Sequence, residues 1–133
     1  MPTLDEIRAF MANEFPQSTM ELLAIGDGVA KGRQEVDRSH LRPGGTVSGP
    51  AMMALADAVT YVALLSRIGM VPLAVTSNLN ISFLRRPKAE RAVVAVATLL
   101  KVGRKLAVAE VRITSEGEED LVAHATITYA IPG

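Results

Sequence analysis

The sequence contains no cysteine and only two histidines among its 133 residues. Without cysteine, the chain has no disulfide bonds, no cysteine nucleophile and no thiolate metal site. Two histidines, with no carboxylate pair at ligand spacing, are too few for a common metal site, so we expect no metal. Basic and acidic residues number 14 each, and this balance favours neither nucleic acid nor an anionic membrane as a partner.

Targeting and membrane signals are also lacking. The first residues have neither the basic start nor the apolar run of a signal peptide. The apolar stretch 49–68 lies mid-chain and carries Asp57 and Arg67, which makes it a poor transmembrane candidate. We therefore expect a cytoplasmic protein. With 49% hydrophobic residues, the chain is long enough for one domain, which we assign to residues 1–133.

The pattern along the chain predicts an α+β fold. A capping box at Thr3–Glu6 begins an N-terminal helix that we place within residues 1–16. A long apolar helix is expected over residues 49–68. Alternation and turn residues predict strands at 20–25, 29–36, 74–84, 92–101, 105–114 and 121–131, most of them antiparallel neighbours. A strongly curved antiparallel sheet is needed to wrap around the central helix.

Asp57 is the one carboxylate in this helix. The side chains one turn away are apolar or neutral, so no Lys or Arg at helical spacing can neutralise it. Because the helix is apolar on nearly every face, we expect it to be covered all round and Asp57 to be largely buried. Such a carboxylate is costly. It has a partner elsewhere in the fold, keeps its proton, or lies in a wet pocket where its charge does chemistry.

A glycine-rich loop precedes the helix. Gly44-Gly45 permits a tight turn with positive φ, and Gly49-Pro50 is typical of a helix start. Free N–H groups at such a start bind a phosphate or polarise a carbonyl oxygen. An ordinary turn with Ser48 as N-cap explains the same residues, and the loop has no Walker lysine. Ser48 also lacks the His and Asp partners of a serine nucleophile.

The segment 74–84 alternates cleanly. Its apolar residues occupy every second position, which predicts a half-buried strand with Thr76 on the polar side. This regular edge could pair with its copy in a second subunit and form a homodimer. His124 is expected at the surface or in an interface. His40, before the glycine loop, either lines the site or is an ordinary loop residue.

Four segments together resemble the hotdog-fold acyl-CoA thioesterases, in particular the phenylacetate-degradation (PaaI-like) branch. They are SHLRPGGTVSGP at 39–50, LAD at 55–57, VTSNLNISFLR at 75–85 and GRKLA at 103–107. The resemblance covers about residues 20–131 and implies a single hotdog domain. It also implies a homodimer or homotetramer with active sites between subunits.

The resemblance places three catalytic roles on this sequence. It implies that Asp57 attacks the thioester or activates a water, that the Gly49 N–H polarises the thioester oxygen, and that Thr76 assists the water. Coenzyme A is part of the substrate, so no separate cofactor is implied. The substrate-binding residues implied are His40, Arg42, Ser48, Pro50, Arg85, Arg86, Gly103, Arg104 and Lys105. The four basic residues 85, 86, 104 and 105 are alternatively solvated strand ends.

The implied function is hydrolysis of an aryl- or medium-chain acyl-CoA to free acid and CoA. The family often has His, Gly and Asn where this chain has Ser48, Pro50 and Arg42. These departures keep open a non-catalytic acyl-CoA binding or sensing protein. A hotdog dehydratase would need an Asp–His pair at the site, and a DNA-reading sensor would need a helix-turn-helix that the single helix before Pro16 does not provide.

Overall fold

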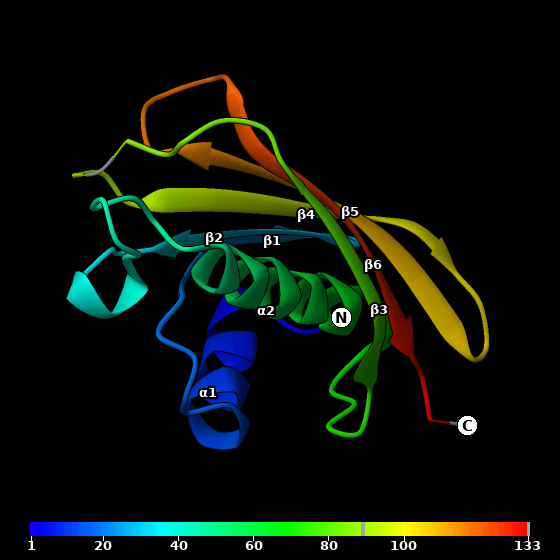
Figure 1. Cartoon of the computed structure of the whole chain (residues 1–133). Coiled ribbons are helices and arrows are strands. Elements are labelled where there is room, and N and C mark those ends of the chain that lie inside the picture. Colours follow the sequence, from blue (N-terminus) through cyan, green and yellow to red (C-terminus); the bar gives the residue numbers. More distant parts are fainter. Residues whose placement is uncertain (89, 133) are drawn as a thin grey trace.

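The computed structural model describes residues 1–88 and 90–132. Its helices are α1 (Leu4–Glu14), a short 3-10 helix η1 (Arg38–His40) and α2 (Gly49–Ile68) (Figure 1). Its strands are β1 (Glu21–Gly26), β2 (Val29–Gln34), β3 (Val75–Phe83), β4 (Val93–Val102), β5 (Leu106–Ser115) and β6 (Leu121–Ala130). Each predicted element is confirmed within about two residues, and α1 ends at Glu14 rather than at 16.

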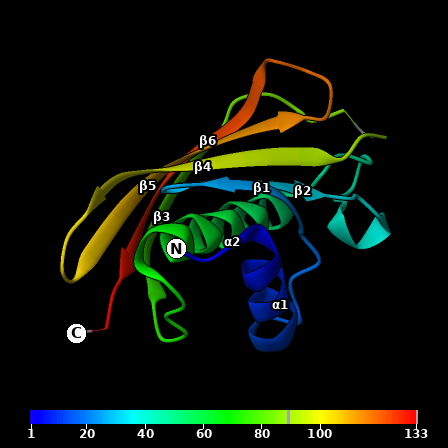
Figure 2. The ribbon, with the colours of Figure 1, turned by 180° about the vertical axis from the view of Figure 1, so that it is seen from behind.

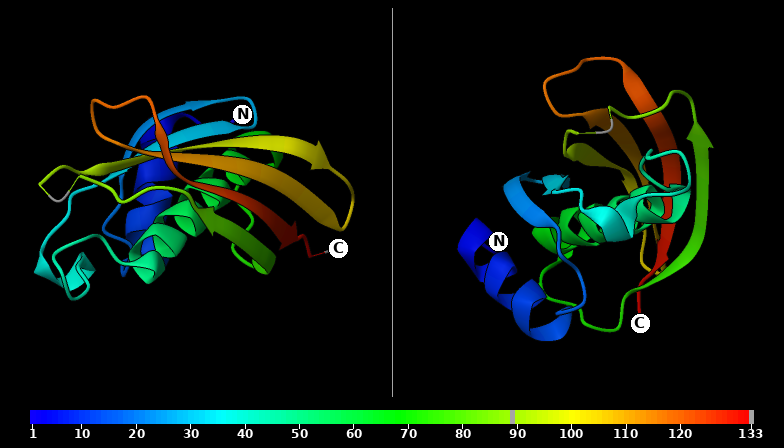
Figure 3. Two further views of the ribbon diagram at one scale, coloured as in Figure 1. Left: turned by 45° about the horizontal axis from the view of Figure 1, so that its top comes forward. Right: turned by 60° about the vertical axis from the view of Figure 1, so that its left-hand side comes forward.

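The described strands form one antiparallel sheet in the order β1-β2-β4-β5-β6-β3. The sheet curves around α2, which lies along its concave face (Figure 3). This arrangement is the predicted hotdog fold. The core joins buried branched residues of α2, such as Val59 and Val62, to alanines of the central strands, such as Ala95 and Ala125. Small side chains on the sheet let the helix approach it closely.

Helix α2 is long and apolar enough to cross a membrane, but 67% of its apolar window is buried inside this fold. Helix α1 packs on the side of α2 away from the sheet (Figure 2). The predicted capping box of α1 is confirmed, since Thr3 and Glu6 bond reciprocally. Arg8 of α1 donates to the Leu22 carbonyl of the edge strand β1, with its Nη2 2.7 Å from the oxygen. This contact ties α1 to the sheet.

The prediction that α2 is covered all round is wrong. Pro50, Met53 and Ala54 are exposed, and Asp57 is half-buried. These four residues follow the i, i+3, i+4, i+7 spacing of a single helix face. The sheet covers only one side of α2, and α1 covers the part around Tyr61, where Phe10 and Phe15 contact the tyrosine ring. Asp57 therefore lies at the boundary between the core and solvent.

Strand β3 is an edge strand and is more exposed than predicted. Only Leu79 and Ile81 are half-buried, and the other residues are exposed. Its ladder with β6 is regular from Asn78 to Phe83, but the register shifts between Thr76 and Asn78. This bulge at Ser77 puts Thr76 on the helix-facing side with Leu79 and Ile81. The prediction that Thr76 shares a face with Asn78 is therefore wrong, because one extra residue reverses the alternation.

Candidate active site

The carboxylate of Asp57 is held by two hydroxyl groups from the sheet. Thr76 of β3 donates its hydroxyl to Asp57 Oδ1. Tyr129 of β6 donates to the same oxygen at 2.9 Å, and its hydroxyl also lies 3.2 Å from the Asp57 carbonyl oxygen. Thr76 and Tyr129 are register partners, so the sheet presents both hydroxyls at one point. Oδ1 is fixed in this way, and Oδ2 accepts no hydrogen bond from any described residue.

The sequence reasoning missed Tyr129. Its side chain is 3% exposed, and its ring stacks on Tyr61 with 5.8 Å between centroids. Burial and the charge of Asp57 raise the pKa of Tyr129 well above its usual range. The phenol therefore stays protonated and remains a hydrogen-bond donor wherever the protein is folded. The alternation along 121–131 indicates that Tyr129 points inward, but it does not indicate that Asp57 is its partner.

Two cavities meet at Asp57. One, of about 410 Å³, has aromatic and apolar walls and is lined by Glu14, Phe15, Asp57, Tyr61, Pro72, Ala74, Val75, Thr76 and Tyr129. The other, of about 260 Å³, has mixed walls, in which polar residues such as Gln17, Ser18, Thr19 and His40 alternate with apolar ones such as Met20, Ala51, Ala54 and Leu55. We call them the aromatic cavity and the mixed cavity. His40 lines the mixed cavity, and it also caps η1, since its Nδ1 accepts from the Asp37 N–H at 3.0 Å.

The start of α2 offers one free N–H group. The Ser48 hydroxyl accepts from the Ala51 N–H at 3.2 Å, as an N-cap does, and Pro50 has no N–H. The Gly49 N–H has no acceptor among the residues that the structure describes. A Cβ atom at Gly49 would lie 3.2 Å from the Phe83 ring, so the ring favours glycine there. The predicted positive φ angles of the glycine loop are confirmed, at 97° and 78°.

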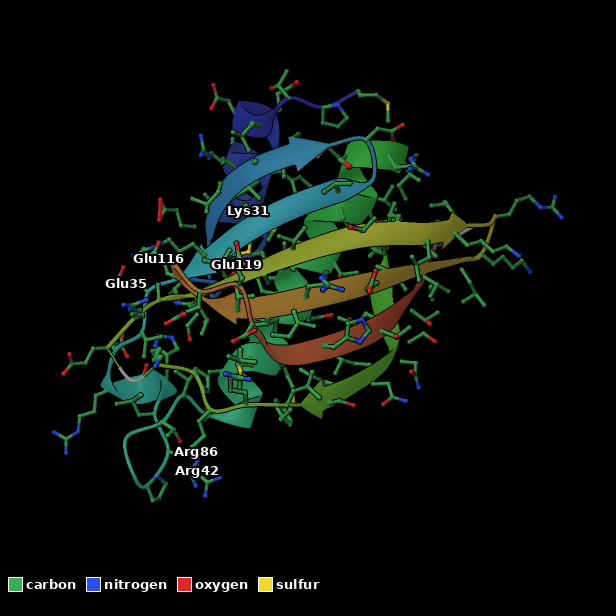
Figure 4. All side chains as sticks on the ribbon, turned by 90° about the horizontal axis from the view of Figure 1, so that it is seen from above. Lys31, Glu35, Arg42, Arg86, Glu116 and Glu119 are labelled. Carbon is green, nitrogen blue, oxygen red and sulfur yellow. The ribbon has the colours of Figure 1, made fainter. Side chains whose placement is uncertain are left out.

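Basic residues surround this helix start. A cavity of about 550 Å³ is lined by Gly49, Pro50 and Phe83, and by Arg42, Arg85 and Arg86. Figure 4 shows Arg42 and Arg86 side by side, although one precedes α2 and the other follows β3. Arg85 also pairs with Asp120, at 3.3 Å on the surface. The structure thus brings five of the predicted substrate-binding and oxyanion residues to one cavity, which we call the basic cavity.

The other predicted basic turn lies elsewhere. Gly103, Arg104 and Lys105 form the tip of the β4–β5 hairpin, and the following Leu106 pairs with Ala130. Phe83, just before Arg85, pairs with Ala123, seven residues from Ala130 and so about 23 Å along the strand. Figure 1 shows the hairpin and the segment after β3 at opposite ends of the sheet. In one chain, therefore, Arg104 and Lys105 do not join Arg85 and Arg86.

Gly49 and Asp57 are also separated. Eight residues of α-helix put about 12 Å between their positions along the axis. A thioester needs a donor and a carboxylate each about 3 Å from adjacent atoms, so one chain does not present both to one substrate. His124, as predicted, lies on the outer face, where Nε2 is 2.8 Å from Glu110 Oε1. No group of three His, Asp or Glu side chains within 1–88 and 90–132 is placed to hold a metal ion.

Comparison with known proteins places the fold in a family. The sequence profile of the thioesterase superfamily matches residues 44–122. A protein from Silicibacter sp. TM1040 assigned as a thioesterase is 44% identical, with a TM-score of 0.89 over 97% of this chain and 91% of that one. A variant of the phenylacetic acid degradation protein PaaI from Thermus thermophilus is 29% identical, with a TM-score of 0.76 over 93% and 99%.

More distant structures share the fold. A thioesterase from Streptococcus pneumoniae TIGR4, solved with coenzyme A, is 23% identical and has a TM-score of 0.82 over 92% of this chain and 97% of that one. A search of curated protein sequences found no match. The profile match covers more than half of the chain and includes the glycine loop, the Asp57 helix and β3. The chain therefore belongs to the thioesterase superfamily and is a thioester hydrolase.

Proposed function

We propose that the protein hydrolyses acyl-CoA thioesters, with Asp57 as general base or nucleophile. The observation that carries this is the carboxylate itself, which is fixed through Oδ1 and free at Oδ2, between two cavities. In either role the carbonyl carbon gains a C–O bond while its oxygen becomes an oxyanion. The C–S bond then breaks, the thiolate of CoA leaves and takes a proton, and water supplies the hydroxyl of the free acid.

The active site is assembled from two subunits. The β3 edge is unpaired in one chain and carries exposed apolar residues, since Val75 is 57% and Leu84 is 58% exposed. Soluble proteins rarely leave such an edge free. If two copies of β3 pair antiparallel about Leu79, the Phe83 end of one strand meets the Val75 end of the other. That pairing brings the Gly49 N–H of one subunit toward Asp57 of the other, where one thioester reaches both.

The same pairing gathers the basic residues. The β4–β5 hairpin lies at the Val75 end of the sheet, and the basic cavity lies at the Phe83 end. Antiparallel pairing puts the hairpin of one subunit near the basic cavity of the other. In this dimer the hairpin residues Arg104 and Lys105 of one subunit lie near the basic cavity of the other, which contains Arg42, Arg85 and Arg86. Guanidinium and ammonium groups suit the phosphates of CoA. CoA in the S. pneumoniae structure supports this ligand.

Assembly can be measured directly. We expect light scattering at micromolar concentration to give a homodimer or homotetramer, because pairing buries the apolar β3 edge. Leu84→Glu puts a charge at that edge and should raise the dissociation constant at least about 10-fold. Ala24→Glu is the control, because Ala24 is exposed on β1, at the edge of the sheet opposite to β3. A wild-type monomer would contradict the shared site.

The contribution of the hairpin charges to binding of the CoA nucleotide is tested by removing them. Arg104→Ala with Lys105→Ala should raise KM for an acyl-CoA about 10-fold or more and leave KM for a short thioester without the nucleotide nearly unchanged. Only the acyl-CoA has phosphates to lose. The comparison of the two substrates by the same variant is its own control. If both KM values rise equally, the hairpin residues act in folding and not in binding CoA.

A second candidate is an acyl-CoA binding or sensing protein without turnover. It is favoured by Ser48 and Arg42, which replace the His and Asn that resembling thioesterases often carry. A panel of aryl, short, medium and long acyl-CoAs separates the two candidates. Binding without hydrolysis across the whole panel would support the sensor. For either candidate we propose a cytoplasmic location, which the absence of cysteine fits and which fractionation of cells would check.

A further inference from the structure

The aromatic cavity differs from the mixed cavity in the number of aromatic side chains that line it. Its walls are the rings of Phe15, Tyr61 and Tyr129 together with Pro72 and Val75, and its volume is about 410 Å³. Flat rings pack well against other rings, and apolar walls favour an acyl group over water. The mixed cavity is smaller, at about 260 Å³, and of these three rings only that of Phe15 lines it. An aryl acyl group therefore fits the aromatic cavity better.

One charged residue other than Asp57 lines this cavity. Glu14 is the last residue of α1 and precedes Phe15, so its carboxylate lies at the cavity wall. Burial, and then the charge of Glu14, raise the pKa of Tyr61, which lines the same cavity. The ion pairs within the described part of the chain do not include Glu14. Its charge is therefore not neutralised locally.

We propose that Glu14 is a specificity-determining residue: with the aromatic walls it admits uncharged acyl groups, aryl ones best, and rejects acyl groups that end in a carboxylate. This inference rests on the proposed function, because it assumes that the thioester carbon lies at Asp57. An acyl group bound there extends into the cavity, so a terminal carboxylate approaches Glu14. Two like charges about 12 Å apart near a protein surface, at an effective dielectric constant of about 20, repel by an amount worth about a 10-fold loss of affinity. A ring hydroxyl or amino group could instead donate to Glu14.

The test compares two substrates of equal chain length. Hexanoyl-CoA and adipyl-CoA both have six acyl carbons, and only adipyl-CoA ends in a carboxylate. Wild-type protein should prefer hexanoyl-CoA in kcat/KM. Glu14→Gln should raise kcat/KM for adipyl-CoA about 10-fold and change that for hexanoyl-CoA less than 2-fold. Asp5→Asn is the control, because it removes one negative charge from the same helix about 14 Å away and should change neither value.

A second variant tests the cavity itself. Ala74 is buried in its wall, and Ala74→Leu should lower kcat/KM for phenylacetyl-CoA about 10-fold more than for acetyl-CoA, whose acyl group is too small to need the space. Equal losses on both substrates would overturn the cavity as the acyl site. Hydrolysis with an unchanged adipyl-to-hexanoyl ratio in Glu14→Gln would overturn the role of Glu14 alone. No hydrolysis of any acyl-CoA by wild-type protein would overturn the proposed function and this inference with it.

Discussion

Replacing Asp57 with Asn is expected to lower kcat on acyl-CoA substrates by about 10²-fold or more. The amide can neither accept a proton from water nor attack the thioester carbon. Its shape is nearly that of the carboxylate, and its carbonyl oxygen can still accept from Thr76 and Tyr129. The free energy of unfolding should therefore change by less than about 1 kcal/mol. Steady-state kinetics and a thermal melt of the same preparation check both parts.

The two readouts distinguish a catalytic from a structural Asp57. A catalytic carboxylate gives lost turnover with an intact melting temperature. A structural one gives the reverse, a lower melting temperature with turnover preserved, and that result would contradict the assignment. Binding of a non-hydrolysed acyl-CoA analogue should be little changed in Asp57→Asn, which shows that the site is still assembled.

Replacing Tyr129 with Phe is expected to lower kcat about 10-fold or more while KM stays within about 2-fold. Phe keeps the ring stacked on Tyr61 and deletes only the hydroxyl that donates to Asp57 Oδ1. With Thr76 as the only remaining donor among the described residues, the carboxylate can rotate, and small misplacements of a reacting group are costly in rate. Tyr129 is thus a positioning residue, and the loss should fall on kcat.

Thr60→Val is the matched control for Tyr129→Phe. Thr60 is buried in α2 three residues after Asp57, and its hydroxyl donates to the Ala56 carbonyl and not to the carboxylate. Removing it should leave kcat nearly unchanged. If Tyr129→Phe lowers the melting temperature and raises KM without lowering kcat, the hydroxyl serves packing and not the placement of Asp57.

Local patterns predicted the fold well. Alternation and turn residues located the strands, and the apolar run 49–68 located the helix that they wrap around. The capping of the helix start also followed from local chemistry, because Ser48 is the N-cap and Pro50 lies in the first turn. These features depend on neighbours in sequence, which a single sequence displays.

The features that the sequence did not predict depend on partners distant in sequence. Tyr129 and Asp57 are 72 residues apart, and the sequence around neither residue indicates that they form a hydrogen bond. The exposure of the helix face around Ala54 depends on how far the sheet wraps, which periodicity does not encode. The resemblance assigned Arg104 and Arg85 to one substrate site, and within one chain the strand register separates them.

The bulge at Ser77 divides β3 into two parts whose inward and outward positions are out of phase. From Asn78 onward, alternation against β6 fixes which residues face the helix. Before the bulge, Thr76 takes its orientation from the extra residue. A relative that lost Ser77 would continue the ladder from Asn78 without a break, so its hydroxyl would still lie opposite Tyr129 and face the carboxylate, and the loop before the strand would keep its length. An alignment of such relatives therefore needs a one-residue gap at Ser77 to match the hydroxyls that share a role.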